Sequence, residues 1–74
     1  LGNYETAISL YDGIIGRASS DYIKAQALYE AGLANQAQGQ NAEAIERFGY
    51  AVEHYPLSYY SYLSLVALLD AGGR

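Results

Sequence analysis

Residues 25–56, AQALYEAGLANQAQGQNAEAIERFGYAVEHYP, contain two helical patterns on either side of a glycine turn. Before the turn, the stretch is rich in alanine, leucine, glutamine and glutamate, which are strong helix formers. After it, apolar residues recur at steps of three and four from Ala44 to Tyr55, along one stripe of a helix. Gly39 stands where the first helix would end, and Pro56 stands where the second could not continue. The stretch therefore predicts two antiparallel helices joined by a short turn.

Helical patterns continue on both sides of this pair, and no segment alternates with the period of two that is typical of strands. Gly16 is expected to end the preceding helix as its C-terminal cap. The helix that follows it is expected to have its N-cap at Ser19, Ser20 or Asp21. Ser58 is placed to cap a last helix after the proline. We expect four helices, near residues 3–15, 21–38, 41–55 and 58–71.

The sequence also repeats itself. GNYETAISLY, residues 2–11, aligns with GQNAEAIERF, residues 39–48, at an offset of 37. ALYEAGLANQAQG, which begins at Ala27, aligns with SYLSLVALLDAGG, which begins at Ser61, at an offset of 34. We therefore expect a piece of a longer protein, made of a half repeat, a full repeat and a second half repeat: residues 1–21, 22–57 and 58–74.

This repeat resembles the tetratricopeptide repeat, which has a period of about 34 residues and a pattern with a glycine, an A-x3-F element and a closing proline. Those places are filled by Gly32, Ala44, Phe48 and Pro56. The tryptophan, leucine and tyrosine of the family pattern are replaced by Leu28, Ala31 and Asn35. The resemblance implies an all-α fragment of an α-solenoid, built of antiparallel helix-turn-helix repeats. The small residues Gly32 and Ala44 would let its two helices approach closely.

Composition excludes several classes of function. The 74 residues carry a net charge of −4, with four lysines and arginines against eight aspartates and glutamates, so a nucleic-acid phosphate backbone would be repelled. No apolar run reaches the roughly 18 residues that indicate a membrane span. There is no cysteine, and His54 is the single histidine, so a zinc site cannot be assembled. We expect no nucleic-acid partner, no membrane span, no metal and no cofactor.

No residues are arranged as a catalytic site. A serine nucleophile needs a base and an orienting group, and no sequence context links a serine to His54. Glu43 and Glu46 lie on one expected helix with Arg47 nearby, a pattern typical of a solvated face. We therefore expect no enzymatic activity and no catalytic residue.

The resemblance implies a binding groove, because the first helix of each pair lines the concave side in this family. Members that clamp acidic peptide tails carry lysine, arginine and asparagine there, whereas this chain has Tyr29, Leu33, Tyr60 and Ser64 at such places. We expect Tyr29 and Tyr60 to point away from the core and to bind a neutral or basic segment. The implied groove residues are Gln26, Tyr29, Leu33, Gln36, Tyr60, Leu63, Ala67 and Asp70.

The remaining apolar positions divide between core and surface. The expected core is Ile8, Tyr11, Ile15, Leu28, Gly32, Ala44, Ile45, Phe48, Val52, Tyr62, Leu65 and Val66. The last expected helix has more apolar residues than one helical pair can cover: Tyr62, Leu63, Leu65, Val66, Leu68 and Leu69. Because large apolar patches rarely stay bare, we expect a homodimer through the terminal helices.

Two functional hypotheses remain. The first is a non-catalytic protein–protein interaction scaffold that binds a protein segment or associates with itself. The second begins from YPLSYYSYLSLVALL, residues 55–69, which resembles a stretch in the helical superhelix of bacterial soluble lytic transglycosylases. It would make the chain an accessory domain of a peptidoglycan-cleaving enzyme whose catalytic glutamate lies in a separate lysozyme-like domain. The location would then be extracytoplasmic, and otherwise cytoplasmic.

Overall fold

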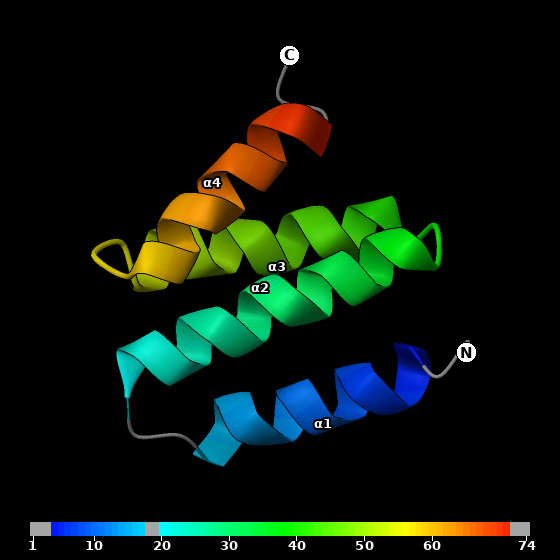
Figure 1. Ribbon diagram of the computed structural model, residues 1–74, viewed down its shortest axis with the longest axis horizontal. Coiled ribbons are helices and arrows are strands. Elements are labelled where there is room, and N and C mark those ends of the chain that lie inside the picture. The colour runs from blue at the N-terminus through cyan, green and yellow to red at the C-terminus, as the bar shows by residue number, and fades with distance from the viewer. Residues whose placement is uncertain (1–3, 18–19, 72–74) are drawn as a thin grey trace.

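The computed structural model describes residues 4–17 and 20–71, which form four helices (Figure 1). No described residue lies in a strand, so the predicted all-α class is confirmed. Each helix begins and ends within two residues of its predicted bounds. The helices are α1 (Tyr4–Arg17), α2 (Asp21–Ala37), α3 (Asn41–His54) and α4 (Tyr59–Ala71).

The turns follow the predicted capping residues with one exception. Gly39 has a φ of +77°, the left-handed conformation that favours glycine, and it ends α2 as expected. The Ser20 hydroxyl accepts a hydrogen bond from the Ile23 amide at 3.5 Å and caps α2. The Ser58 hydroxyl accepts from the Tyr60 amide at 3.2 Å at the start of α4. Gly16 does not end its helix, because α1 continues through it to Arg17.

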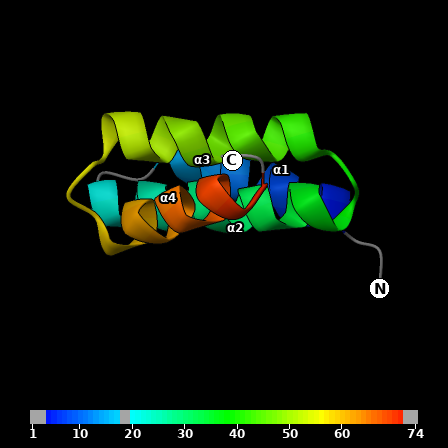
Figure 2. The same ribbon diagram turned by 90° about the horizontal axis from the view of Figure 1, so that it is seen from above.

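Helix α2 lies at the centre of the molecule and packs against each of the other three helices. Figure 2 shows α3 in one layer and α2 together with α4 in the other. The carboxyl ends of α1 and α3 lie at the same end of the molecule as the amino ends of α2 and α4 (Figure 1). The first turns of α2 and α4 therefore lie at the same end of the molecule.

The core is built from small side chains around one large ring. Phe48 of α3 is fully buried, and a Cβ atom added at Gly32 of α2 would lie within 3.0 Å of three carbon atoms of its ring. The absence of a side chain at Gly32 thus creates the space that Phe48 fills. Of the predicted core, four residues are buried and four are half-buried. The buried ones are Leu28, Gly32, Ala44 and Phe48, and the half-buried ones are Ile8, Tyr11, Ile15 and Val52.

The remaining four core predictions are wrong. The exposed fractions are 40% for Ile45, 61% for Tyr62, 42% for Leu65 and 41% for Val66. Helix α4 instead turns Ser61 and Ser64 inward, and the Ser61 hydroxyl donates a hydrogen bond to the Ala51 carbonyl oxygen at 3.0 Å. Small side chains suit a close approach of α4 to α3, and large apolar ones are left outside.

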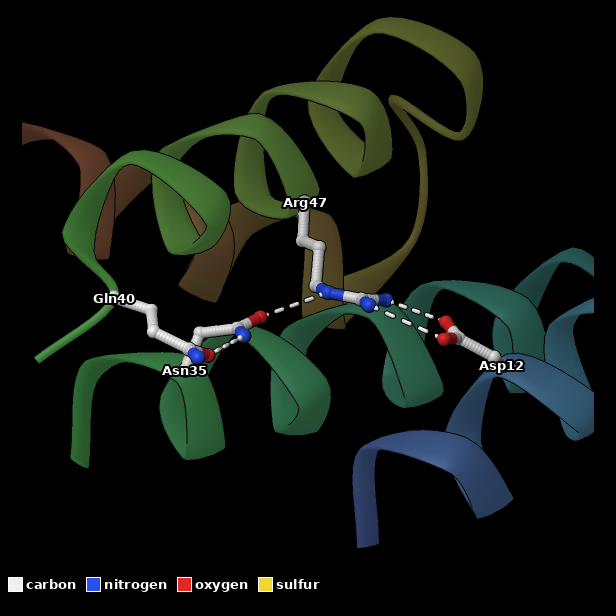
Figure 3. A network of polar contacts seen from close by, with 4 residues as sticks. All are labelled: Asp12, Asn35, Gln40 and Arg47. Carbon is white, nitrogen blue, oxygen red and sulfur yellow. Dashed lines mark hydrogen bonds and ion pairs between the residues drawn. The ribbon is translucent and has the colours of Figure 1, made fainter. Parts of the chain in front are cut away.

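A polar network ties three helices together (Figure 3). From α3, the Arg47 guanidinium donates through Nη1 to Oδ1 of Asp12 in α1 at 2.6 Å, and through Nε to Oδ1 of Asn35 in α2 at 2.8 Å. Asn35, which is buried, donates in turn from Nδ2 to Oε1 of Gln40 at 2.8 Å. The network holds α1 and α3 in register on the two sides of α2.

Candidate binding surface

Four tyrosines from α2 and α4 form a cluster in which the ring of Tyr60 contacts each of the other three. The ring centroid of Tyr60 in α4 lies 5.9 Å from that of Tyr29 in α2 and 5.4 Å from that of Tyr22. It also lies 5.5 Å from that of Tyr59. These separations are in the range in which aromatic pairs attract one another. We call these four residues the tyrosine path: Tyr22, Tyr29, Tyr59 and Tyr60.

The four rings differ in how much solvent they meet. Tyr22 is 52% exposed and Tyr59 is 60% exposed, whereas Tyr29 and Tyr60 are half-buried. The Tyr29 ring also lies 5.9 Å from the ring of Phe48, so it supports the core as well as the surface. The prediction that Tyr29 points away from the core is therefore only partly right.

Tyr22 was missed by sequence reasoning, although a signal for it exists. It precedes Tyr29 by seven residues, about two helical turns, and so falls on the same side of α2. Its edge-to-face contact with Tyr60, at an interplanar angle of 64°, shows that the shared face begins at the first turn of α2.

The other predicted groove residues are spread more widely. Gln26 is half-buried, and its Nε2 donates to Oε2 of Glu30 at 3.4 Å. In Figure 1, α2 and α4 draw apart toward their carboxyl ends. No hydrogen bond between described residues joins Gln36 to Asp70. Among these outer positions Leu33 and Asp70 are exposed, and three are half-buried: Gln36, Leu63 and Ala67.

Two shallow hollows between α1 and α2 involve the predicted residues of α2. A hollow of about 370 Å³ is lined by Tyr29 and Leu33 together with Ala7 and Tyr11 of α1. Another of about 230 Å³ is lined by Gln26 and Tyr11, among others. Gln26, Tyr29 and Leu33 therefore also border α1, a neighbour that the groove prediction did not include.

Glu30 lines both hollows and changes the acidity of nearby tyrosines. Hydrogen bonding to its carboxylate, together with burial and its negative charge, raises the pKa of Tyr11 above the ordinary value of 10.0. Loss of solvent, the neighbouring Tyr22 and the Glu30 charge raise the pKa of Tyr60. Both hydroxyls are therefore neutral hydrogen-bond donors at physiological pH, as a binding surface for polar groups needs.

The close contact between Gly32 and Phe48, the buried Ala44 and the proline after α3 are the pattern of one repeat family. A family model described as tetratricopeptide repeat matches residues 26–58. The chain contains a tetratricopeptide repeat. The matched residues cover most of α2, all of α3 and the turn that leads to α4. No curated protein and no solved structure matches the chain significantly.

Tetratricopeptide repeats stack into curved surfaces that bind other molecules, so the match indicates a protein-interaction module. In the part of the chain that the structure describes, no helix is long and apolar enough to cross a membrane. Within the same residues, no three histidine, cysteine, aspartate or glutamate side chains are grouped so that they could hold a metal ion. What the described geometry offers is an aromatic surface with hydroxyl groups.

Proposed function

We propose that the chain is a non-catalytic scaffold whose α2–α4 face binds a peptide or a segment of another protein. The observation that carries the proposal is the tyrosine path. Its rings are held in place by one another, so little side-chain entropy remains to be lost on binding. Tyrosine is also enriched among the residues that dominate binding energy at protein interfaces.

The charge of the chain favours a neutral or basic segment. The net charge is −4, and Asp70 lies exposed beyond the tyrosine path on α4. Complementary charge mainly increases the rate of association and suppresses wrong partners. The basic residues with which family members clamp acidic tails are replaced by Tyr29, Leu33, Tyr60 and Ser64, so an acidic tail is disfavoured.

The proposal is tested by selecting peptides from a random displayed library on the wild-type chain. Each selected peptide is then measured against Tyr60→Ala and against Tyr50→Ala. Tyr50 is the matched control, because it is an exposed tyrosine of α3 that stacks on His54 and lies outside the tyrosine path. Tyr60→Ala should weaken binding about fivefold or more, the loss expected for an interface residue that matters.

Tyr29 is less suitable for this test because its ring also supports Phe48, and its removal would lower stability. Circular dichroism would check that each variant is folded. Selected peptides that bind Tyr60→Ala as tightly as the wild type would contradict the proposed surface. A library that yields no binder would count against a peptide-binding function.

Self-association is the second candidate, and the internal repeat favours it. We define the open face of α4 as Tyr62, Leu65, Val66 and Leu69, all of which are exposed. At the offset of 34 they correspond to residues of α2 that are buried in the repeat, many of them against α3. Those α2 residues are Leu28, Ala31, Gly32 and Asn35. This correspondence depends on the division of the chain into a half repeat, a full repeat and a second half repeat, which we propose together with self-association.

A helix like α3 would not fit this open face, because Val66 stands where α2 has Gly32. A second copy of α4 fits better. In an antiparallel pair, Tyr62 of one copy would face Leu69 of the other, and Leu65 would face Val66, so the stripe is self-complementary. Asp70 is the only charged residue of α4, so the paired helices would bring few like charges close together.

Light scattering at high micromolar concentration tests the homodimer. Leu65→Ser should shift the wild-type chain toward monomer, whereas Ile45→Ser, a change at an equally exposed apolar residue of α3, should not. A wild-type chain that is strictly monomeric would contradict self-association.

The resemblance of residues 55–69 to bacterial lytic transglycosylases stays a prediction, since no comparison supports it. The discriminating observation is the parent open reading frame. A signal sequence and a lysozyme-like domain in that frame would favour an extracytoplasmic accessory role. Further helical pairs without such a domain would exclude it.

A further inference from the structure

A pocket of about 350 Å³ lies at the end of the molecule where α2 and α4 begin and α3 ends. Its volume is near the lower limit of about 300–1,000 Å³ that is typical of ligand pockets, so it suits a single side chain or a small group. The groups that matter in its wall are Asp21, Tyr22, His54, Tyr55 and Tyr59.

The chemistry of this wall is that of a site for an organic cation. Three tyrosines line it, and the face of a tyrosine ring carries the negative part of the aromatic quadrupole. Asp21 supplies a carboxylate that forms no ion pair with any described residue. No lysine or arginine lines the pocket, and the chain as a whole is negative. The wall therefore holds no lysine or arginine to neutralise the carboxylate, and a bound cation would.

The helix ends around the pocket do not reverse this charge. The amino ends of α2 and α4 carry partial positive charge, and the carboxyl end of α3 carries partial negative charge. The Ser20 and Ser58 hydroxyls cap the two amino ends by accepting hydrogen bonds from backbone amides. The full charge of Asp21, in the first turn of α2, then determines the sign of the local potential.

The pocket continues directly from the tyrosine path. Tyr22 and Tyr59 belong to both, and the ring of each contacts the ring of Tyr60 at 5.4 and 5.5 Å. Leu57, in the loop at the rim, is an apolar residue that is almost fully exposed. A segment that crosses Tyr60 toward this end would thus reach the pocket without leaving the aromatic surface.

We infer that the pocket binds the guanidinium group of an arginine side chain carried by the partner segment. A guanidinium is planar, stacks on aromatic rings and pairs with a carboxylate through two parallel hydrogen bonds. Stacking on the tyrosines and pairing with Asp21 would thus use both kinds of group in the wall. This inference rests on the proposed function for the origin of the arginine, but the pocket's preference for a cation can be tested alone.

The test uses N-acetyl-arginine amide, with N-acetyl-citrulline amide as a probe of equal length and planarity but no charge. Both are titrated into the ¹⁵N-labelled chain and followed by two-dimensional NMR. The arginine probe should shift the amides of Asp21, Tyr22, Tyr55 and Tyr59. It should bind about fivefold more tightly than the citrulline probe, as a cation–π contact and one partly exposed ion pair predict.

Substitutions at Asp21 and Tyr59, with one at Glu43 as a control, test whether the arginine probe binds in this pocket. Asp21→Asn should weaken binding of the arginine probe about threefold or more, whereas Glu43→Gln should leave it unchanged. Glu43 is the matched control because it is also an acidic residue in the first turn of its helix, α3, and lies outside this pocket. Tyr59→Leu keeps an exposed apolar side chain but removes the ring, and it should weaken binding by a similar factor.

Equal binding of the two probes would overturn the inference, and so would wild-type affinity in Asp21→Asn or amide shifts centred elsewhere. If Asp21→Asn does not fold, the comparison of Tyr59→Leu with the wild type decides. Failure of this inference can be distinguished from failure of the proposed function. Suppose that peptides selected on the wild type lose their binding to Tyr60→Ala, while the pocket shows no preference for arginine over citrulline. The peptide-binding scaffold would then be supported, and the assignment of this pocket to arginine would be contradicted.

Discussion

Phe48 of α3 fills the space that Gly32 of α2 leaves by having no side chain. This contact explains why two positions, 16 residues apart in the sequence, carry so much of the family signature. It sets how closely α2 and α3 approach, and the turn at Gly39 keeps the two helices antiparallel.

A methyl group at Gly32 should destabilise the fold. The new Cβ would lie within 3.0 Å of the Phe48 ring, so we expect Gly32→Ala to cost about 1–3 kcal/mol of unfolding free energy through overpacking. Gly49→Ala is the matched control, because that glycine is also helical and its added Cβ would lie within 4 Å of no described atom beyond its chain neighbours and the backbone of its own helix. The control should be stabilised by about 0.5–1 kcal/mol, since alanine favours helix. Urea denaturation followed by circular dichroism measures both, and equal effects would contradict the packing account.

Removal of the Phe48 ring should be more severe. Its side chain is fully buried, and large-to-small changes of this kind cost about 3–5 kcal/mol. A chain of this size has little stability to spare, so Phe48→Ala should be largely unfolded at 25 °C. A thermal transition like that of the wild type would show that the register of α3 is wrong.

The two inward serines of α4 should respond in opposite directions to alanine. The Ser64 hydroxyl is buried without a hydrogen-bond partner among the described residues, so Ser64→Ala should stabilise by about 1 kcal/mol. Ser61→Ala removes a hydroxyl that donates to the Ala51 carbonyl, which then accepts only from the Tyr55 amide, so it should destabilise by about 1 kcal/mol. Thermal melts of both variants test the orientation of α4, and a destabilised Ser64→Ala would argue against it.

Tyr11 should lose its proton at a higher pH than an ordinary tyrosine, because its pKa is raised. The folded-state pKa of Tyr11 lies above the ordinary 10.0, so the folded chain holds this proton more tightly than the unfolded chain. Its contribution to stability is therefore fully present below pH 10.0 and is lost as the pH rises through the raised pKa. In absorbance titrations at alkaline pH, Tyr11→Phe should remove a late-titrating group, and Glu30→Gln should shift that group to lower pH. No change in either variant would contradict the contact with Glu30.

The packing of α2 against α3 could be predicted from sequence because the residues of each helix indicate which of its sides is buried. The stripe of α3 has one apolar side, and Gly32 and Phe48 are informative about which sides meet. The sequence of α4 does not indicate which of its sides is buried, because the helix is apolar on nearly every side and has a single charged residue. Its true inward residues, Ser61 and Ser64, are polar, and only the close packing of the folded chain selects them.

The candidate site was predictable to a similar extent. Tyr29 and Tyr60 were expected on one surface, and their rings are in contact. The pocket beside Asp21 could not be predicted, because its wall comes from α2, from the end of α3 and from the loop before α4. Which of these segments meet is a property of the tertiary fold and not of any one helical pattern.

The most direct test of the central claim is NMR mapping of a selected peptide on the ¹⁵N-labelled chain. If the α2–α4 face is the binding surface, the amides that shift should cluster around the tyrosine path, and Tyr60→Ala should abolish most of those shifts at equal peptide concentration. Shifts that cluster instead on the open face of α4 or along the outer side of α1, and that persist in Tyr60→Ala, would contradict it.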